Sequence, residues 1–421
     1  MKLISVAIRC VVIMKSRACL AGVGLMLLMA LSRAAEASET TPRPRLAIWC
    51  EFPPYARAAE ALPSLARHHC DLLLHIEDDS IGDTNLVALC REARRQGVAV
   101  HAWFLLPYDE HLYLGEDSIA RMRRLAFGFF EWADSNRLDI REAAMDCEPS
   151  PLLGQKMSAE LSRRSPAGLA RVLRNEKNPE RFVRSAAEIN GLVAALRARG
   201  HPVMGTANRV FLDAARYRNL TMEDTLNAPF SVIGWAHPSF IMYRYKASQA
   251  MYVAMANRYA AFAARCYGGD AALDLGLVGD HSRIPGFANR AERFGNAAFY
   301  RGFLAGMRSP ADLEQAVGVA LGRGITRINL FSLDGAVASP PGLDAWLDAA
   351  AGSRPRGALG RWTPWQSTKL AATMWGAEWV FRGMVHQARY RIAPRPPSPP
   401  AEPKPWAASA SAGQTVVDEA R

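Results

Sequence analysis

Several sequence patterns that mark common classes of enzyme and binding protein are missing from this chain. It has no CxxC pair and no Cys/His spacing of a structural zinc site, and it lacks both a G-x-S-x-G nucleophile motif and a glycine-rich phosphate loop. No stripe of Lys and Arg interleaved with aromatic residues suggests a nucleic-acid groove. The sequence therefore predicts no metal ion, no cofactor and no nucleic-acid partner.

Cysteine is scarce, and its use leaves two structural alternatives open. Seven Cys occur in 421 residues, and those after position 37 are Cys50, Cys70, Cys90, Cys147 and Cys266. Their odd number leaves at least one thiol unpaired. Cys70 precedes a predicted strand and Cys90 lies in the predicted helix after it, so a disulfide between them is possible in an oxidising compartment. Buried free thiols are the alternative, because Cys often packs as a small hydrophobic residue.

A long hydrophobic run is also missing, and the longest one near the N-terminus fits a secretory signal. A short basic region, Met14–Arg17, precedes the twelve apolar residues Leu20–Leu31, and Ala35-Glu36-Ala37 has the small-x-small form of a cleavage site. The run is shorter than a spanning helix requires. We therefore predict a signal peptide over residues 1–37, cleaved after Ala37, and a secreted or periplasmic protein with no stable membrane insertion. An N-terminal membrane anchor is the alternative.

The charge balance is modestly basic. The formal charge of the whole chain is +11, and removal of residues 1–37 leaves 46 Lys and Arg against 39 Asp and Glu. For an exported protein, this surplus favours an anionic glycan or the cell envelope as the partner of its basic surface.

Eight short apolar runs recur along the chain, and stretches with helical spacing separate most of them. The runs are Leu46–Cys50, Asp71–Ile76, Val98–Leu106, Glu142–Cys147, Pro202–Asn208, Phe240–Tyr245, Ala272–Val278 and Arg327–Ser332. The helical stretches include Tyr55–His69, Thr84–Gln96, Ile119–Leu138 and Phe182–Arg199. Buried parallel strands read as continuous hydrophobic runs, and eight βα units are the number that closes a (β/α)8 TIM barrel. The sequence predicts this barrel over residues 38–351.

The ends of the predicted strands carry acidic, amide and aromatic side chains. They are Glu51, Glu77, Asp79, Tyr108, Asp146, Glu148, Asn208, Tyr243, Asp280 and Asp334. In a (β/α)8 barrel the active site forms at the C-terminal ends of the strands. The predicted barrel therefore has an acidic mouth.

Three further segments have distinct compositions. The connection after the fourth predicted strand, residues 149–179, is long and basic, and it is either a functional lid or binding loop or a solvated helical insertion. Residues 352–391 predict a C-terminal helical extension, with a helix over Ser367–Tyr390 docked on the barrel. Residues 392–421 are rich in Pro and Ala and predict a disordered tail.

The fourth predicted strand supplies the main candidate catalytic pair, Asp146 and Glu148. Side chains alternate along a strand, so both are expected to point into the barrel mouth. Two carboxylates this close resist ionising together, which raises the pKa of one and makes it a proton donor near neutral pH. A leaving glycosidic oxygen needs such a donor. Glu148, nearer the rim, is the candidate general acid, with Asp146 as its partner; structural carboxylates that bind backbone N–H groups or Arg are the alternative.

Asp146-Cys147-Glu148 resembles the end of the D-x-x-D-x-D-x-E motif of family-18 glycoside hydrolases, the chitinase-like barrels. Met242-Tyr243 resembles their Met-x-Tyr region, and Leu333-Asp334-Gly335 is similar to their last strand. The resemblance implies a (β/α)8 barrel, Glu148 as acid and Tyr243 near the substrate. The chain departs from the family at Ala144, where an Asp is usual, at Arg244, where an Asp is also usual, and at Phe331, near the position of a tryptophan.

Cys147-Glu148-Pro149 also resembles the Asn-Glu-Pro sequence of the large clan of retaining glycosidases. That resemblance implies Glu148 as acid/base and a carboxylate nucleophile on the seventh strand, where Asp280 is the candidate. The separation of the two carboxylates distinguishes retention from inversion.

Other residues are candidates for substrate contact. Glu51, Asn208, Asp280 and Asp334 are polar groups at strand ends, and Trp49, Trp103 and Tyr243 are aromatic rings able to stack on sugars or to fill the barrel core. The acidic residues 77–79, with His75, His281 and Asp280, are a weaker candidate for a cation site. A solvated loop or helix cap explains most of that cluster.

These observations predict an exported glycoside hydrolase-like protein that cleaves envelope or extracellular polysaccharide by carboxylate acid/base catalysis. The alternative, favoured by Ala144 and Arg244, is a catalytically inactive barrel that binds glycan or an envelope protein.

Overall fold

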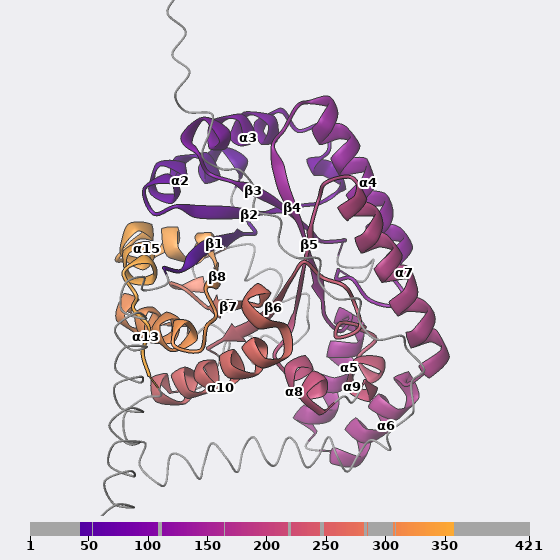
Figure 1. The fold of residues 1–421 in the computed structure, drawn as a ribbon. Coiled ribbons are helices and arrows are strands. Elements are labelled where there is room, and N and C mark those ends of the chain that lie inside the picture. The colour runs from indigo at the N-terminus through magenta and orange to yellow at the C-terminus, as the bar shows by residue number, and fades with distance from the viewer. Residues whose placement is uncertain are drawn as a thin grey trace, which may run out of the picture.

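Eight parallel strands form a closed barrel in the computed structural model of the chain (Figure 1). The structure describes residues 43–52, 54–107, 112–163, 165–217, 220–244, 248–281, 284, 306–307 and 309–357. The predicted signal peptide, almost all of the predicted C-terminal extension, the tail and Tyr108 lie outside these residues. The predicted (β/α)8 barrel is confirmed.

The strands follow one another around the barrel in sequence order. They are β1 Arg45–Cys50, β2 Cys70–Ile76, β3 Val100–Phe104, β4 Ile140–Cys147, β5 Val203–Asn208, β6 His237–Tyr243, β7 Ala272–Gly276 and β8 Arg327–Phe331. Each strand pairs with the next, and β8 pairs with β1 through the register Trp49↔Phe331, which closes the ring. All eight predicted runs overlap the observed strands.

Helices surround the barrel on its outer side (Figure 1). They are α2 Tyr55–Arg67, α3 Thr84–Gln96, α4 Ile119–Ser135, α5 Pro151–Ser162, α6 Pro166–Glu176, α7 Pro179–Ala198, α8 Val210–Tyr217, α9 Thr221–Thr225, α10 Gln249–Tyr267, α13 Pro310–Leu321, α14 Leu333–Ala338 and α15 Leu343–Ala351, with short 3₁₀ turns η1 Asp78–Ser80 and η3 Gly268–Asp270. The four predicted helices correspond to α2, α3, α4 and α7.

Four of the described helices begin with the same local signal, a capping side chain followed by proline. At α5 the cap is Ser150, which accepts a hydrogen bond from the backbone N–H of Leu153 at 3.3 Å. Ser165 accepts a hydrogen bond from the backbone N–H of Gly168 at the start of α6, and Asn178 accepts one from Arg181 at the start of α7. Ser309 has the same place before α13. The cap satisfies a free N–H group and proline fits the first turn, so each of these helices has a defined start.

The apolar residues form two separate cores. The larger core lies between the strands and the outer helices, and it includes Met145 and Cys147 of β4. The smaller core fills the barrel interior and includes Trp49, Trp103 and Ala144. Because side chains alternate along a strand, the inward position of Ala144 indicates that Asp146, two residues later in β4, faces the interior as well. Glu148 follows the last residue of the strand.

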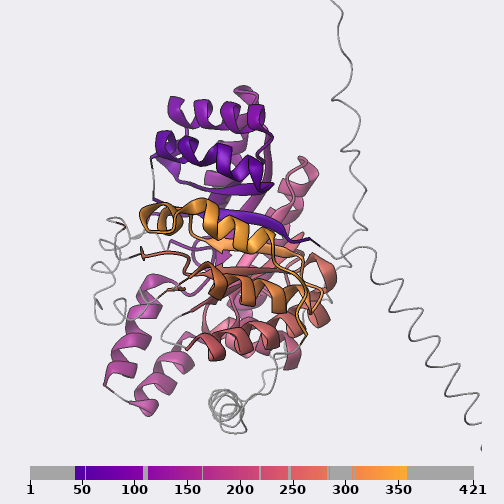
Figure 2. The ribbon, with the colours of Figure 1, turned by 90° about the vertical axis from the view of Figure 1, so that its left-hand side faces the viewer.

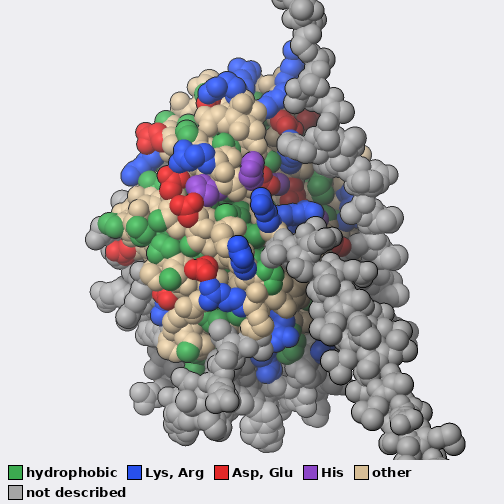
Figure 3. Space-filling model, turned by 60° about the vertical axis from the view of Figure 1, so that its left-hand side comes forward, with side chains coloured by type: hydrophobic (Ala, Val, Ile, Leu, Met, Phe, Trp, Pro, Cys, Tyr) green, Lys and Arg blue, Asp and Glu red, His purple; other side chains and the backbone are tan. Residues whose placement is uncertain are grey.

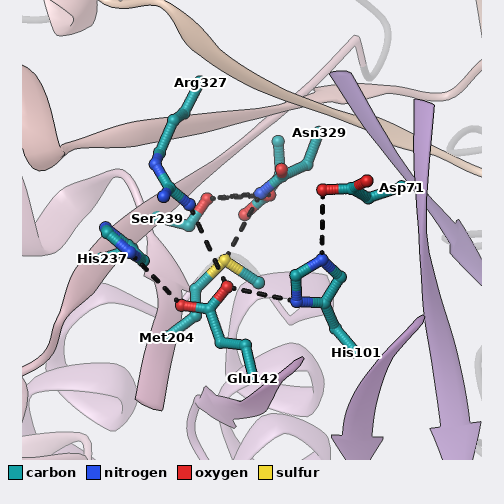
Figure 4. Close-up of polar contacts among 9 residues, drawn as sticks. Asp71, His101, Glu142, Met204, His237, Ser239, Arg327 and Asn329 are labelled. Carbon is teal, nitrogen blue, oxygen red and sulfur yellow. Dashed lines mark hydrogen bonds and ion pairs between the residues drawn. The ribbon is translucent and has the colours of Figure 1, made fainter. Parts of the chain in front are cut away.

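A charged layer replaces the usual apolar side chains at the amino ends of several strands (Figure 4). His101 of β3 lies 3.2 Å from a carboxylate oxygen of Asp71 and 3.3 Å from one of Glu142. His237 and Arg327 approach the same Glu142 at 3.6 and 4.0 Å. Burial acts to lower the pKa of His101, but the two carboxylates outweigh burial and raise that pKa to about 9.

The first and last helices of the described chain are linked by ion pairs on the face that carries α2 and α15. Arg67 donates to Asp344 at 2.8 Å, and His68 lies 2.9 Å from Asp348. Basic and acidic side chains are interspersed with apolar ones on this face (Figure 3). Pairs this exposed contribute about 0–1 kcal/mol each, so they add little to the stability that comes from the core.

The long connection after β4 folds into the two helices α5 and α6, which pack on each other beyond the strand ends (Figure 2). Its basic residues are partly neutralised, because Lys156 pairs with Glu176 and Arg163 with Glu160. None of the helices in the described part of the chain is long and apolar enough to cross a bilayer.

Candidate active site

The barrel mouth brings together carboxylates from three strands. Asp146 and Glu148 come from the end of β4, Glu51 follows β1, and Asp274 lies in β7. Burial raises the pKa of Asp146 well above its usual value, and the negative charges of Glu148, Asp274 and Glu51 raise it further. Because these charges act on Asp146 together, the four carboxylates form a single cluster, which we call the acidic pit.

Glu148 is the member of the pit nearest the surface. It is half-buried, whereas Asp146 is only 7 % exposed. Burial, followed by the charge of Asp274, raises the pKa of Glu148 to about 7. A carboxyl group with this pKa holds its proton in a large fraction of molecules at neutral pH, which is the state that a general acid requires.

Asp274 is the pit residue that the sequence analysis missed. One of its oxygens, Oδ1, accepts hydrogen bonds from Trp49 at 3.2 Å, Ser239 at 2.8 Å and Asn329 at 2.7 Å. Burial raises the pKa of Asp274 to about 6, against the lowering effect of these donors. The signal for it in the sequence is a lone acidic residue inside the apolar run Ala272–Val278, whereas the predicted carboxylate nucleophile, Asp280, lies beyond the end of β7.

Asp334 holds the end of β1 in position. Its two carboxylate oxygens accept hydrogen bonds from the backbone N–H groups of Glu51 at 3.1 Å and Phe52 at 2.8 Å. Burial and then the charge of Glu51 raise the pKa of Asp334 to about 6, although the backbone donors act to lower it. Both carboxylate oxygens of Asp334 are used in these contacts. Asp334 therefore positions the backbone at Glu51.

His75 of β2 contacts the same segment. Its Nδ1 lies 3.1 Å from the backbone carbonyl oxygen of Glu51, and its Nε2 lies 3.0 Å from Glu77. The ring is also 5.6 Å from that of Trp103. His75 thus supports the wall of the pit between β1 and β3.

The two tryptophans lie inside the barrel. Trp49 and Trp103 are 2 % and 3 % exposed, and their rings meet edge to face at 4.7 Å. In this arrangement they fill the interior layer, as the alternative interpretation expected. Tyr243, at the end of β6, is half-buried and packs on Phe331 at 4.9 Å, so it is the aromatic candidate nearest the rim.

Two further candidates make local contacts at strand ends. Asn208 accepts a hydrogen bond from the backbone N–H of Val210 at 3.3 Å, and the backbone N–H of Asp280 donates to Ser339 at 2.9 Å. Both residues are half-buried. The charges that raise the pKa of Asp146 include that of Asp274. Asp280 stays a predicted candidate for substrate contact.

The weaker cation candidate has a structural explanation. Asp78 in the cluster after β2 pairs with Arg121, and Ser80 closes a capping box with Glu77. Within the described ranges, no group of three or more His, Cys, Asp and Glu residues has a geometry that holds a metal ion. Cys70 and Cys90 are both buried and free, so the structure contains the free-thiol alternative for this pair.

The comparisons with known proteins identify no family from sequence. No protein-family profile and no curated protein sequence matches this chain. Among solved structures, a GH18 chitinase from Pseudoalteromonas aurantia is similar with 9% identity and a TM-score of 0.43, over 73% of this chain and 99% of that one. The spore cortex-lytic enzyme SleL of Bacillus megaterium has 10% identity and a TM-score of 0.43, over 76% and 77%.

A glucosidase from Croceicoccus marinus is similar with 11% identity and a TM-score of 0.40, over 74% of this chain and 66% of that one. Family-18 chitinases are thus among the solved barrels that resemble this chain. At these identities the likeness shows the fold alone.

Proposed function

We propose that this protein is an exported glycoside hydrolase that cleaves glycosidic bonds in envelope or extracellular polysaccharide. The observation that carries the proposal is the pairing of a half-buried carboxyl group, Glu148, whose pKa is about 7, with more deeply placed carboxylates in one pit. Two carboxyl groups in unequal environments are the requirement for glycosidic bond cleavage.

In the proposed mechanism Glu148 donates its proton to the oxygen of the leaving sugar. The C1–O bond then breaks, and positive charge develops at C1 and the ring oxygen of the remaining sugar. Asp146 has a raised pKa of its own, and the positive charge that develops beside it favours loss of its proton to water. The ionised carboxylate then stabilises this charge and activates the attacking water or takes the nucleophilic position. The negative charge of Asp274, which lies deeper in the barrel than Glu148, raises the pKa of Glu148. Asp334 holds the backbone of Glu51 in place through a hydrogen bond.

A polysaccharide panel tests the proposal. The mature protein, residues 38–421, is incubated with neutral, anionic, N-acetylated and de-N-acetylated polysaccharides, and released reducing ends and binding are both scored. Release from at least one polymer by the wild-type protein supports hydrolysis. The Glu60→Gln variant, which changes an exposed carboxylate on α2, is expected to match the wild type.

Binding without release by the wild-type protein supports the second candidate, an inactive barrel that holds glycan. Ala144 is the observation in its favour, because this interior position is apolar and packs with Trp103 and Met204. Arg244 is the other feature in its favour, and its guanidinium pairs with Asp312 of α13 at 2.9 Å.

The export part of the proposal depends on residues 1–37. Expression of the full chain and N-terminal sequencing of the extracytoplasmic product should give a protein that begins at Ser38. A product that keeps its N-terminus and sediments with membranes would support the anchor alternative.

A further inference from the structure

The acidic pit contains buried carboxylate oxygens whose hydrogen bonding is incomplete. Oδ2 of Asp274 has no hydrogen-bond partner among the described residues, and Oδ1 of Asp146 makes no bond of good geometry there, although the indole of Trp103 lies close enough to lower the pKa of Asp146. Asp146 is 7 % exposed and Asp274 is fully buried. The hydroxyl oxygen of Thr206, which sits opposite Asp146 in the β4–β5 register, is likewise buried without a partner in that set. Buried polar atoms in native proteins are normally satisfied, so these atoms point to a ligand.

For Asp146, Glu148 and Asp274, the described groups that shift the pKa include no cation. The shifts of Asp146, Glu148 and Asp274 come from burial, from other carboxylates and from neutral donors. Of the two arginines that follow neighbouring strands, Arg244 pairs with Asp312, and the charge of Arg209 acts on the tyrosines of α10. When they ionise, these three carboxyl groups of the pit therefore repel one another, and a bound cation would relieve that repulsion.

We propose that the pit binds a hexosamine unit whose amino group is free, so that the substrate is a cationic, de-N-acetylated polysaccharide. This inference deepens the hydrolase proposal above and depends on it for the role of the ligand as a substrate. An ammonium group offers three hydrogen-bond donors and one positive charge, and Asp146 is the carboxylate placed to receive it. A neutral sugar leaves the repulsion among the carboxylates in place, and an anionic sugar increases it.

The position of each carboxylate along its strand indicates its role in binding the sugar. Glu148 lies just beyond the last residue of β4, Asp146 lies one residue inside it, and Asp274 lies two residues inside β7. The amino group thus sits against Asp146, with the charge of Asp274 beneath it, and Glu148 remains available as the proton donor. A sugar with a free amino group has no acetamido oxygen for substrate assistance, so the carboxylates of the chain must act themselves.

Binding of a cation should release protons from the pit. The titratable and charged groups that face this site are Glu51, Asp146, Glu148, Asp274, Asp334, His75 and Tyr243. A bound ammonium group favours the ionised form of the neighbouring carboxyl groups, so affinity for it rises with pH across the range near 6 in which Asp274 titrates. At higher pH the amino group of the sugar loses its own proton, and the affinity of the pit for the sugar then stops rising.

Calorimetry on the Glu148→Gln protein tests the inference without interference from hydrolysis. The probes are the β-1,4-linked tetramers of glucosamine and N-acetylglucosamine, cellotetraose and tetragalacturonate. We expect the glucosamine tetramer to bind at least tenfold more tightly than the other three, to release protons at pH 6, and to lose affinity with added salt. Equal affinities, a preference for another probe, or no binding of the glucosamine tetramer at millimolar concentration would overturn the inference.

Asp274→Asn, added to the same protein, provides the matched variant. We expect it to weaken the glucosamine tetramer at least fivefold and to leave cellotetraose unchanged, whereas a purely structural role would affect both sugars equally. The two proposals fail separately. Hydrolysis of neutral or anionic polymers without a preference for free amino groups rejects only the inference, and binding of the glucosamine tetramer by a wild-type protein that cleaves nothing rejects only the hydrolase.

Discussion

The indole Nε1 of Trp49 donates a hydrogen bond of 3.2 Å to the carboxylate of Asp274, which lies 225 residues further along the chain. This bond crosses the barrel interior from β1 to β7. It fixes the position of a carboxylate whose charge acts on both Asp146 and Glu148. A side chain of the interior core therefore helps to position a carboxylate of the acidic pit.

Asp274→Asn should lower the pKa of Glu148. The charge of Asp274 is the second cause, after burial, of the raised value near 7, and the amide removes that charge while its oxygen keeps an acceptor for Trp49. Since the general acid must be protonated, the alkaline limb of the kcat/KM profile should shift to lower pH by about 0.5–1 unit. An alkaline limb that does not move would show that Asp274 does not act on the catalytic acid. Ser239→Ala, which removes only a neutral donor, is the control.

The same variant should change the pH dependence of stability. The pKa of Asp274 is raised to about 6 in the folded state, above the usual value near 4, so its contribution to stability is present below pH 4 and is lost as the pH rises through 6. The asparagine variant does not titrate and avoids this loss of about 1–3 kcal/mol. Urea unfolding at pH 5 and pH 8 should show a smaller decrease for the variant than for the wild type.

Glu142→Gln should destabilise the charged layer at the opposite end of the barrel. It leaves the buried His101 and the partly buried His237 and Arg327 without the carboxylate that they share, at a cost of about 3–5 kcal/mol. The pKa of His101 is raised to about 9, so its contribution is fully present below pH 6.5 and is lost as the pH rises through 9. In Glu142→Gln one of the two carboxylates that raise the pKa of His101 is gone, so the loss of stability with rising pH should begin at a lower pH.

Unfolding free energies measured from pH 6 to pH 10 check this prediction. Glu131→Gln is the matched control, because its exposed pair with Arg199 at 3.4 Å is expected to contribute less than about 1 kcal/mol. Equal losses in the two variants would contradict the account of the buried layer.

Gly205→Ala should destabilise the barrel through a steric clash. A Cβ atom at this position of β5 would lie 2.2 Å from the ring of Trp235, which is held by a hydrogen bond to the carbonyl oxygen of Phe230. The cost is about 1–3 kcal/mol. Gly154→Ala on α5 has no atom within 4 Å of the new methyl group and should be neutral or stabilising by up to about 1 kcal/mol. If the thermal midpoints of Gly205→Ala and Gly154→Ala fell by the same amount, the argument that Trp235 lies too close to Gly205 for a methyl group would be refuted.

The thiols provide a direct test of the cysteine assignment. Cys50, Cys70, Cys90 and Cys147 are buried, and burial raises the pKa of each, whereas Cys266 is partly exposed. In the native mature protein a thiol reagent should label Cys266 first, and denaturation should expose five free thiols. A count of three after denaturation, without reductant, would reveal a disulfide.

The strand periodicity was sufficient to predict the barrel and the inward face of β4, on which Ala144 lies. Alternation fixes which residues of β4 share a face, and the acidic side chains at its end then mark the mouth. Asp274 could not be placed in the same way, because β7 is apolar on both faces and its register is set only by pairing with β6 and β8. Asp334 was identified as a rim residue, but its bonds to the backbone of Glu51 and Phe52 depend on the closure of the ring between β8 and β1.

The turnover of Glu148→Gln on the best substrate of the panel tests the central claim most directly. The account predicts that kcat falls by roughly 10²–10⁴-fold, because the amide cannot donate the catalytic proton. The thermal midpoint should stay near that of the wild type, since a half-buried carboxyl with a raised pKa contributes little to stability in its ionised form. Turnover equal to that of the wild-type protein would contradict the assignment of Glu148 as the acid.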